Sequence, residues 1–501
     1  MKRALALMLI LLCALMMTGC MPLSINLQRD DQVVLLPTPD ERENAPAIGD
    51  SLPSASYYLP LHFVSADKQR LIPFSRAVTV SGSQSLVRET LLTLLNAEHA
   101  PDAFSPFPEG TRLLGVEQNG NLAVVDLSID ARNVESEQQY LWMREAIAAT
   151  IVGLEGIEYV NVLVAGRDEG ILSLPSGCSQ GEAGSMAAAW MKRTAERELL
   201  DKGGETPPSI VRSAVIYYAA QDGQYIAPVV KDVRVTDGDY ITPVIEALMN
   251  CEGVTGSLRS PFPQETDVLK EKPEIVETGS GRRMVKLTFD ANLVATLERE
   301  KLSAWQLYAS LTYTLTGFVP EIDGLIVLIG DGQLAKTERG DQELTFTGGE
   351  MNRSVYPDAV CRLAATYMNA ADGGLHKLYR PLDQRSAVSP RALLGELFDG
   401  PAEWEEGAAR VMPDGVSIDD ILGIRITGEG AIVNLSSNFY RCCQSLTAQQ
   451  ERNMIYAMVN TLTELPLVDQ VSFQVEGETV DHLVSSVFLR GPLMRNPGII
   501  R

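Results

Sequence analysis

The sequence predicts an α/β (α+β) chain of tandem two-layer sandwiches, each with a small, mostly antiparallel or mixed sheet and two helices on one face. Three observations support this prediction. A domain-sized unit recurs along the 501 residues, each copy alternates strand-like and helix-like patterns, and 45% of the residues are hydrophobic. The chain is therefore long and apolar enough to fill a separate core in each copy.

The first two copies are related by a constant shift. Residues 70–80 (Arg-Leu-Ile-Pro-Phe-Ser-Arg-Ala-Val-Thr-Val) reappear at 225–235 as Tyr-Ile-Ala-Pro-Val-Val-Lys-Asp-Val-Arg-Val, 155 positions later. Ser-Pro-Phe-Pro at 105–108 recurs at 260–263 with the same shift. Because one register holds over so many residues, the match indicates duplication of a whole domain.

A third copy is visible at other landmarks. Val-Asp-Leu-Ser-Ile-Asp at 125–130 corresponds to 285–290 and 433–438, and Thr-Ile-Val-Gly-Leu at 150–154 corresponds to 314–318 and 461–465. Met412-Pro-Asp-Gly stands where Phe107-Pro-Glu-Gly stands in the first copy. The sequence thus contains three diverged versions of one unit.

Each copy opens with strands and a helix. The first copy has an extended segment at 57–63 and a strand at 77–80, and the other copies begin at 215–219 and 375–379. The helix of the first copy has residues at three- and four-residue spacing that form one apolar face, namely Leu86, Thr90, Leu91, Leu94 and Leu95. In the third copy Ser389 and Pro390 predict an N-cap and a first-turn proline.

The second half of each copy predicts a hairpin, a longer helix and a final strand. Gln118-Asn119-Gly120-Asn121 is a strong turn signal before a strand at 122–129, and Gly428-Glu429-Gly430 takes that place in the third copy. The long helices are predicted at 137–154, 303–317 and 447–465, and alternating final strands at 160–164 and 471–475.

The predicted layout comprises a signal peptide at 1–20, a flexible tether at 21–54, a first domain at 55–185, a connector helix and linker at 186–212, a second domain at 213–353, a connector helix at 354–373 and a third domain at 374–501. The connectors rest on apolar periodicity at 186–200 and 355–371. An alternative is that each is the C-terminal helix of its own domain.

The N-terminus predicts export and lipid anchoring. Lys2 and Arg3 precede an apolar stretch at 4–17, which has signal-peptide proportions. Thr18-Gly19-Cys20 resembles a bacterial lipobox, which would make Cys20 the lipidated residue; Met17 stands where Leu is usual. The alternative is a plain secretory signal with an incidental cysteine. Two acyl chains give stable membrane anchoring.

Charge and cysteine content exclude several classes of function. The net charge of −23, or −25 without Lys2 and Arg3, disfavours nucleic acid and anionic lipid surfaces as partners of the folded part. Five cysteines of the exported part have no recurring spacing and do not form a disulfide framework, although a single bridge remains open: Cys178, Cys251, Cys361, Cys442 and Cys443. We expect the vicinal pair Cys442-Cys443 to be buried as small apolar side chains.

Taken together, the motifs resemble those of the GerM-type (GerMN) domain of sporulation and spore germination proteins. The resemblance rests on the extended start with Tyr, the Leu-Leu-Thr-Leu-Leu-Asn helix end, the Phe-Pro-Glu-Gly-Thr loop, the Val-Asp-Leu-Ser strand and the Thr-containing helix before a Val-x-Val-x-Val strand. It covers nearly all of 55–490 in three copies. The second copy departs with Lys286 in place of Asp126, and the third has Met-Pro-Asp-Gly-Val in the loop.

The resemblance implies an extracytoplasmic, lipid-anchored and non-enzymatic role. Domains of this family are similar to ring-building modules of the envelope complex that joins mother cell and forespore, and are linked to cell-wall events in germination. The family supplies no catalytic residue, cofactor or metal site to carry over.

Enzyme signals in the sequence are weak. Gly177-Cys-Ser179-Gln-Gly181 matches a G-x-S-x-G nucleophile elbow, but Pro175 interrupts the required strand and the copy-two counterpart at 347–351 has no serine. The four histidines, His62, His99, His376 and His482, show no metal-binding spacing. Asp126 and Asp130 lie four apart on one strand, yet Lys286 and Asn434 replace Asp126 in the other copies, which disfavours a glycosidase pair.

Three functional classes remain: an assembly module, a binder of wall glycan or peptide, and a serine hydrolase. Repetition without a repeated reactive group favours assembly with envelope or sporulation proteins, since tandem surfaces gain avidity. A glycan binder would more often show exposed aromatic residues, and only 6% of this chain is aromatic. Sedimentation with peptidoglycan sacculi would separate those two classes, and homo-oligomeric rings in electron micrographs would support assembly.

Overall fold

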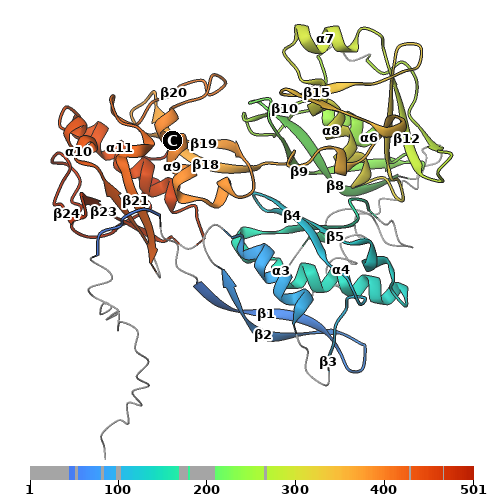
Figure 1. The fold of residues 1–501 in the computed structure, drawn as a ribbon, viewed down its shortest axis with the longest axis horizontal. Coiled ribbons are helices and arrows are strands. Elements are labelled where there is room, and N and C mark those ends of the chain that lie inside the picture. The colour runs from blue at the N-terminus through green and yellow to red at the C-terminus, as the bar shows by residue number, and fades with distance from the viewer. Residues whose placement is uncertain are drawn as a thin grey trace, which may run out of the picture. The chain divides into compact units, whose positions relative to one another are not determined.

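The computed structural model describes residues 45–50, 55–80, 84–97, 103–168, 179–180, 209–264, 268–427, 430–466 and 468–501. Cys20, the tether up to 44, His99, Cys178 and the predicted connector helix at 186–200 lie outside the described residues. Residues 46–501 form one compact unit in which three α+β domains follow one another (Figure 1).

Domain 1 contains an antiparallel hairpin and a separate mixed sheet. Its elements are β1 (Ala55–Ser65), β2 (Leu71–Val80), α3 (Leu86–Asn96), β3 (Ala103–Phe104), β4 (Leu113–Asn119), β5 (Leu122–Leu127), α4 (Glu137–Ile151), β6 (Tyr159–Val164) and β7 (Ser179–Gln180). The sheets have the orders β2-β1-β3 and β4-β5-β6-β7. Strands β5 and β6 are parallel, and α4 is the crossover between them.

Domain 2 repeats this order with an extension at its end. Its elements are β8 (Ser209–Ala220), β9 (Ile226–Thr236), α6 (Thr242–Met249), β10 (Leu258–Arg259), β11 (Glu274–Glu277), β12 (Arg283–Phe289), α7 (Leu293–Arg299), α8 (Ala304–Thr316), β13 (Gly324–Ile329), β14 (Gln333–Leu334), β15 (Thr337–Arg339), β16 (Gln342–Leu344) and β17 (Glu350–Met351). The parallel pair is β12 and β13.

Domain 3 has the same plan. Its elements are β18 (Arg362–Ala370), β19 (Leu375–Leu382), α9 (Pro390–Asp399), β20 (Ala408–Ala409), β21 (Ile421–Thr427), β22 (Gly430–Leu435), α10 (Ser437–Cys443), α11 (Ala448–Leu462), β23 (Gln470–Val475), β24 (Glu478–Thr479) and β25 (Leu493–Met494). The parallel pair is β22 and β23.

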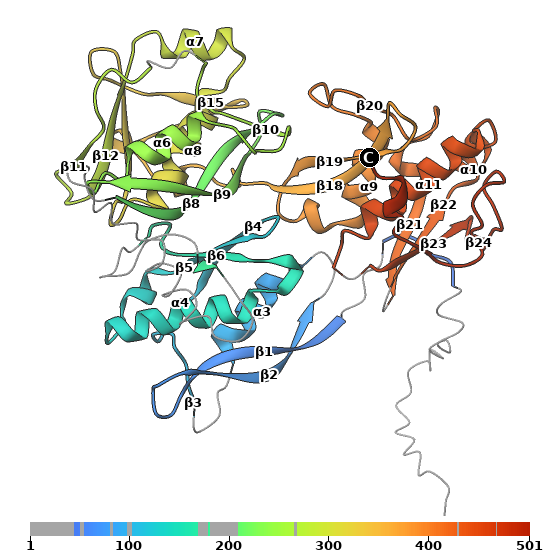
Figure 2. The same ribbon diagram turned by 180° about the vertical axis from the view of Figure 1, so that it is seen from behind.

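The observed layers agree with the predicted α+β class. Each copy also has a second sheet, formed by its first hairpin, which adds a third layer to the two that were predicted. In each copy the long helix α4, α8 or α11 covers the mixed sheet and also packs against the first strand of the hairpin sheet. Figure 2 shows α3 and α4 lying between the β1–β2 hairpin and the β4–β6 sheet. The alternation of apolar and polar residues predicts where strands lie but not which strands pair. The sequence therefore did not show that each copy contains two separate sheets.

The helix starts follow from capping residues, and the N-cap predicted at Ser389 is confirmed. Ser389 accepts a hydrogen bond from the backbone N–H of Ala392, with Pro390 in the first turn. Thr447 and Gln450 form a capping box at the start of α11. The turn before β5 has Gly120 at φ +54°, a conformation that glycine adopts without strain.

The predicted connector helix at 354–373 is wrong, because residues 362–370 form strand β18. This strand pairs with β19 from Arg362↔Leu382 to Asn369↔Leu375, and Gly373 occupies the hairpin turn at φ +89°. Residues 364–368 are all buried, so no alternation marks them as a strand. Tertiary pairing here outweighs the helical propensity of Ala, Leu and Met, and domain 3 begins before 374.

The N-terminal segment 46–50 packs on the outer face of the domain 3 mixed sheet. The backbone of Ala47 accepts a hydrogen bond from Asn434 Nδ2 (3.0 Å) and donates one to Gln474 Oε1 (3.1 Å). Asp50 accepts from Arg391 Nη2 at 2.9 Å. We call residues 46–50 the strap; in Figure 1 it is the dark blue segment beside β21.

Among the residues that the structure describes, no helix combines the length and the apolar character needed to cross a bilayer.

Candidate binding site at the domain junction

The carboxylates singled out in the sequence serve the fold. Asp126 Oδ1 accepts a hydrogen bond from the N–H of Gly166 at 2.8 Å, in the turn after β6. Asn434 Oδ1 makes the equivalent bond to Gly477 at 2.7 Å in domain 3. The shared position therefore fixes a tight turn in both copies, which an amide does as well as a carboxylate.

Asp130 and Lys286 also have local partners. Asp130 Oδ2 accepts from Ser128 Oγ at 2.9 Å, and Lys286 Nζ pairs with Glu274 at 2.8 Å on the neighbouring strand β11. The prediction that both aspartates lie on one strand is wrong, because β5 ends at Leu127 and Asp130 lies in the 3-10 turn Ile129–Arg132. The two aspartates are thus tied to separate local bonds instead of facing a common substrate position.

His62 occupies a structural position that domain 2 repeats with a tyrosine. The backbone N–H of His62 donates to Thr150 Oγ1 (3.1 Å), and that of Tyr217 donates to Thr314 Oγ1 (3.0 Å). Burial lowers the pKa of His62. The described residues contain no group of His, Cys, Asp and Glu that could hold a metal ion.

The described cysteines are all unbridged, and Cys443 is buried as expected. Its Sγ lies 3.9 Å from Met454 Sδ, and burial raises its pKa to about 12. Cys361 is also buried, whereas Cys251 and Cys442 are partly exposed, so the expected burial of the Cys442-Cys443 pair is wrong for Cys442. Ser179 belongs to the edge strand β7, which pairs with β6 where β17 pairs with β13 in domain 2.

Domains 1 and 2 share one hydrophobic core. Leu122, Val124 and Leu163 project from the outer face of the domain 1 mixed sheet and belong to the same buried cluster as the core of domain 2. Domain 3 has a cluster of its own. Domains 1 and 2 are therefore held together by buried apolar packing of the kind found inside a single domain, and they do not form a flexible pair.

A charged network lies at this shared interface. Tyr217 donates its hydroxyl to Glu117 Oε2 at 2.8 Å, and the Arg353 guanidinium lies over the rings of Tyr313 (4.5 Å) and Tyr217 (5.4 Å). Arg353 also donates to the carbonyl of Tyr313 at 2.8 Å. Burial raises the pKa of Glu117, while Arg353 and the Tyr217 hydrogen bond oppose that rise.

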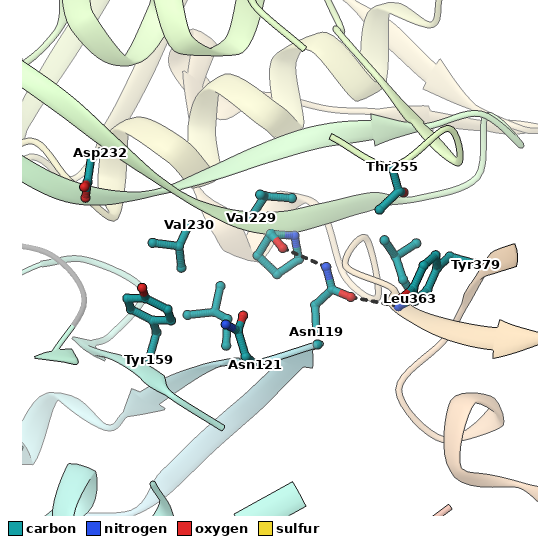
Figure 3. Close-up of a pocket in the computed structure, with 12 residues that line it drawn as sticks. Asn119, Asn121, Tyr159, Val229, Val230, Asp232, Thr255, Leu363 and Tyr379 are labelled. Carbon is teal, nitrogen blue, oxygen red and sulfur yellow. Dashed lines mark hydrogen bonds between the residues drawn. The ribbon is translucent and has the colours of Figure 1, made fainter. Parts of the chain in front are cut away.

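Asn119, at the tip of the domain 1 hairpin, joins all three domains. Its Nδ2 donates to the carbonyl of Pro228 in domain 2 (2.7 Å), and its Oδ1 accepts from the N–H of Leu363 in domain 3 (3.0 Å). Figure 3 shows both bonds. The Asn119 side chain is only 8% exposed, so each hydrogen bond forms with little competition from water.

Further polar contacts support the domain 1–domain 3 side of the junction. Arg362 donates to Gln118 Oε1 (3.1 Å) and pairs with Glu155 (3.4 Å), whose side chain is 4% exposed. Gln384 Oε1 accepts from the N–H of Gln118 at 3.1 Å. Ser257 of domain 2 donates to the carbonyl of Tyr379 in domain 3.

A cavity of about 480 Å³ opens at the junction beside Asn119. Its walls come from all three domains, with Tyr159 below, Val230 above and Tyr379 at one end (Figure 3). The volume lies within the range of about 300–1,000 Å³ that is usual for ligand sites.

Sequence reasoning found Asn119 as a turn residue but missed its role between domains. The Asn-Gly pair fully accounts for the hairpin turn, so the sequence pattern did not indicate a second role for Asn119. Glu117 and Arg353 were also missed, because residues 236 positions apart show no common spacing. One weak signal existed: Glu117 is a charged residue two positions before the Asn119-Gly120 turn.

The comparisons with known proteins identify the family. The model of the Germane family, described as sporulation and spore germination, matches residues 58–170, 215–335 and 367–481. No curated protein matches this chain.

The solved structures similar to this chain include two of GerMN domains and one of a putative lipoprotein. The tandem GerMN domains of the sporulation protein GerM from Bacillus subtilis are 17% identical, with 60% of this chain and 99% of that chain covered and a TM-score of 0.23. A putative lipoprotein from Clostridium perfringens is 22% identical, with 23% and 76% covered and a TM-score of 0.16. The first GerMN domain of GerM is 17% identical, with 26% and 97% covered and a TM-score of 0.22.

Since the family model covers more than half of the chain in three tandem copies, this protein belongs to the Germane family of sporulation and spore germination domains.

Proposed function

We propose that the protein is a non-enzymatic, lipid-anchored assembly module that acts outside the cytoplasm in sporulation or spore germination. The observation that carries the proposal is the use of the repeated polar positions. Asp126, one of the two carboxylates that a catalytic reading would select, and Asn434, its counterpart in domain 3, hold equivalent turns through Gly166 and Gly477. Groups engaged in this way hold turns of their own domains, which supports a structural role and not a catalytic one.

The inter-domain contacts support an assembly role. Domains 1 and 2 share a core, and Asn119 ties the backbones of domains 2 and 3 to the same hairpin. A partner would meet a fixed composite surface, which lowers the entropy lost on binding. Membership of a sporulation and germination family supports a role in that process.

The anchoring part of the proposal depends on Cys20. Cells grown with a radiolabelled fatty acid should incorporate label into the wild-type protein and not into Cys20→Ser, because the thiol carries the lipid. Cys13→Ser is the matched control, since Cys13 lies in the segment that signal cleavage would remove. Label retained by Cys20→Ser would contradict lipid anchoring at this residue.

The assembly part needs a separate test in the native host. Deletion of the gene should reduce the yield of germination-competent spores, and the wild-type gene should restore it. Ser179→Ala should restore it equally, because the proposal assigns no nucleophile to Ser179. Loss of complementation by Ser179→Ala would favour the hydrolase reading and contradict a non-enzymatic role.

A further inference from the structure

The cavity at the domain junction lies along an unpaired strand edge. Strand β9 is the last strand of its sheet, which has the order β10-β8-β9. In an antiparallel pair, alternate residues direct their backbone groups away from the partner strand. The N–H and C=O of Ile226 point outward, since they bond to Ala359 and Cys361. By the same alternation, Pro228 and Val230 also face outward.

The chain itself already uses the first part of this edge. Residues 359–361 form a parallel bridge at Ile226, with N···O distances of 2.9 Å on both sides. The next outward carbonyl, that of Pro228, accepts the side-chain amide of Asn119. An extended backbone and an amide group are thus the partners that this edge accepts. Val230, the next outward residue, borders the cavity. Among the described residues, no group forms a hydrogen bond with its outward backbone N–H or C=O.

The residues that line the cavity indicate which side chains a ligand should carry. Leu363, Tyr379 and Tyr159 supply apolar and aromatic surface. Asp232, which accepts a hydrogen bond from Ser213 Oγ at 2.8 Å, is the one charged residue among the described residues that line the cavity. Within the part of the chain that the structure describes, the buried hydroxyl of Thr255 has no hydrogen-bond partner. A ligand with backbone amides, apolar side chains and a neutral or basic group would fit these walls.

We infer that this cavity binds a short extended peptide segment of a partner protein, which adds to the Val230 edge of β9 with a basic side chain toward Asp232. Main-chain pairing gives affinity in this mode of recognition, and the wall residues give sequence preference. The inference deepens the proposed assembly role and rests on it. Failure of peptide binding would leave lipid labelling at Cys20 unaffected, so the two can fail separately.

The test uses the mature full chain and a fluorescent, end-blocked peptide of alternating Val and Thr with one central Lys. Fluorescence polarisation should show saturable binding, and hydrogen exchange should show new protection in β9. The same peptide with alternate backbone amides N-methylated should bind at least about tenfold more weakly, because it cannot complete the strand pairing. A Glu in place of Lys should also weaken binding.

Two variants locate the site. Val230→Pro removes an outward N–H that β8 does not use, so the sheet should persist while peptide binding falls by about tenfold or more. Ser75→Pro is the matched control, since Ser75 holds the equivalent edge position in domain 1, outside the cavity. Asn121→Trp fills the cavity from the exposed hairpin of domain 1 and should block binding without touching β9.

Three results would overturn the inference. One is the absence of binding by all of the peptides up to about 1 mM. A second is equal binding by Val230→Pro and Ser75→Pro. A third is binding of a disaccharide-peptide fragment of peptidoglycan that Asn121→Trp abolishes while the Val-Thr peptide does not compete, which would assign the cavity to the cell wall.

Discussion

Arg353 is the residue through which the interface of domains 1 and 2 can be tested. Replacement by Met keeps a long apolar stem but removes two hydrogen bonds, to Thr316 Oγ1 (3.1 Å) and to the carbonyl of Tyr313 (2.8 Å). It also removes the cation stacked on Tyr217 and Tyr313. Loss of one member of a buried charged pair costs about 3–5 kcal/mol, and because Arg353 is partly exposed we expect a cost of about 3 kcal/mol.

The cost should depend on Glu117, which would lose its compensating charge. Glu117→Gln keeps the hydrogen bond to Tyr217 without the charge, so the double variant should be more stable than the sum of the single effects by about 1 kcal/mol or more. Arg283→Met is the control, because Arg283 forms an exposed ion pair with Glu321 and should cost below about 1 kcal/mol. Urea unfolding followed by tryptophan fluorescence measures the wild type and all four variants.

The pH dependence of Arg353→Met gives an independent check. Burial raises the pKa of Glu117 in the folded state, and Arg353 limits that rise. A raised carboxyl pKa means that the folded state holds the proton more tightly, so this contribution to stability is present below the unfolded pKa of about 4.3 and is lost as pH rises through the folded value. The variant should therefore be least impaired near pH 4. A cost that stays constant with pH, or additive effects of the two substitutions, would refute a coupled pair.

Three further predictions concern other parts of the fold. Gly423→Ala should release the strap and expose it to proteolysis, since a Cβ would lie 2.5 Å from the carbonyl oxygen of Ala47, whereas Gly115→Ala, at the equivalent bulge with open space around it, should change nothing. Glu451→Gln should destabilise domain 3 by about 2 kcal/mol at neutral pH. Burial raises the Glu451 pKa, but hydrogen bonds from Ser486 and two further backbone N–H groups outweigh it and keep it lowered, so the stabilisation is present above about pH 4.3 and should vanish in acid unfolding curves as pH falls through the folded value. Asn161→Leu should raise the midpoint of thermal unfolding, because both amide atoms of Asn161 are buried without a partner; a lower midpoint would contradict this.

The sequence predicted elements whose pattern is local. Helix α3 begins at Leu86 behind Ser85, and α9 begins at Pro390 behind Ser389, because capping and apolar spacing act within a few residues. The three-fold repeat was equally accessible, since it needs only comparison of the chain with itself. The family ranges agree with that repeat.

Features that depend on long-range pairing could not be predicted. Residues 362–370 have no alternation because β18 is buried on both faces, so only its partner β19 identifies it as a strand. The two bonds of Asn119 reach residues 109 and 244 positions away. No local pattern encodes such distances, and the candidate site is built from contacts of this kind.

The outer face of the mixed sheet has a different partner in domain 1 and in domain 3, and side chains at three equivalent positions account for the difference. In domain 1 it carries Leu122, Val124 and Leu163, which join the core of domain 2. The equivalent positions of domain 3 are Gly430, Ile432 and Gln474, and there the strap covers the face through hydrogen bonds to Gln474 and Asn434.

An apolar face can bury another domain, whereas a polar face needs a partner that offers backbone hydrogen bonds. In tandem arrays, a repeat with a polar outer face serves as a cap. The strap of domain 3 therefore does more than fasten the N-terminal segment. Its hydrogen bonds with Asn434 and Gln474 stabilise a face that is covered by the strap and, among the described residues, does not pack against another domain in the way that the domain 1 face packs against domain 2.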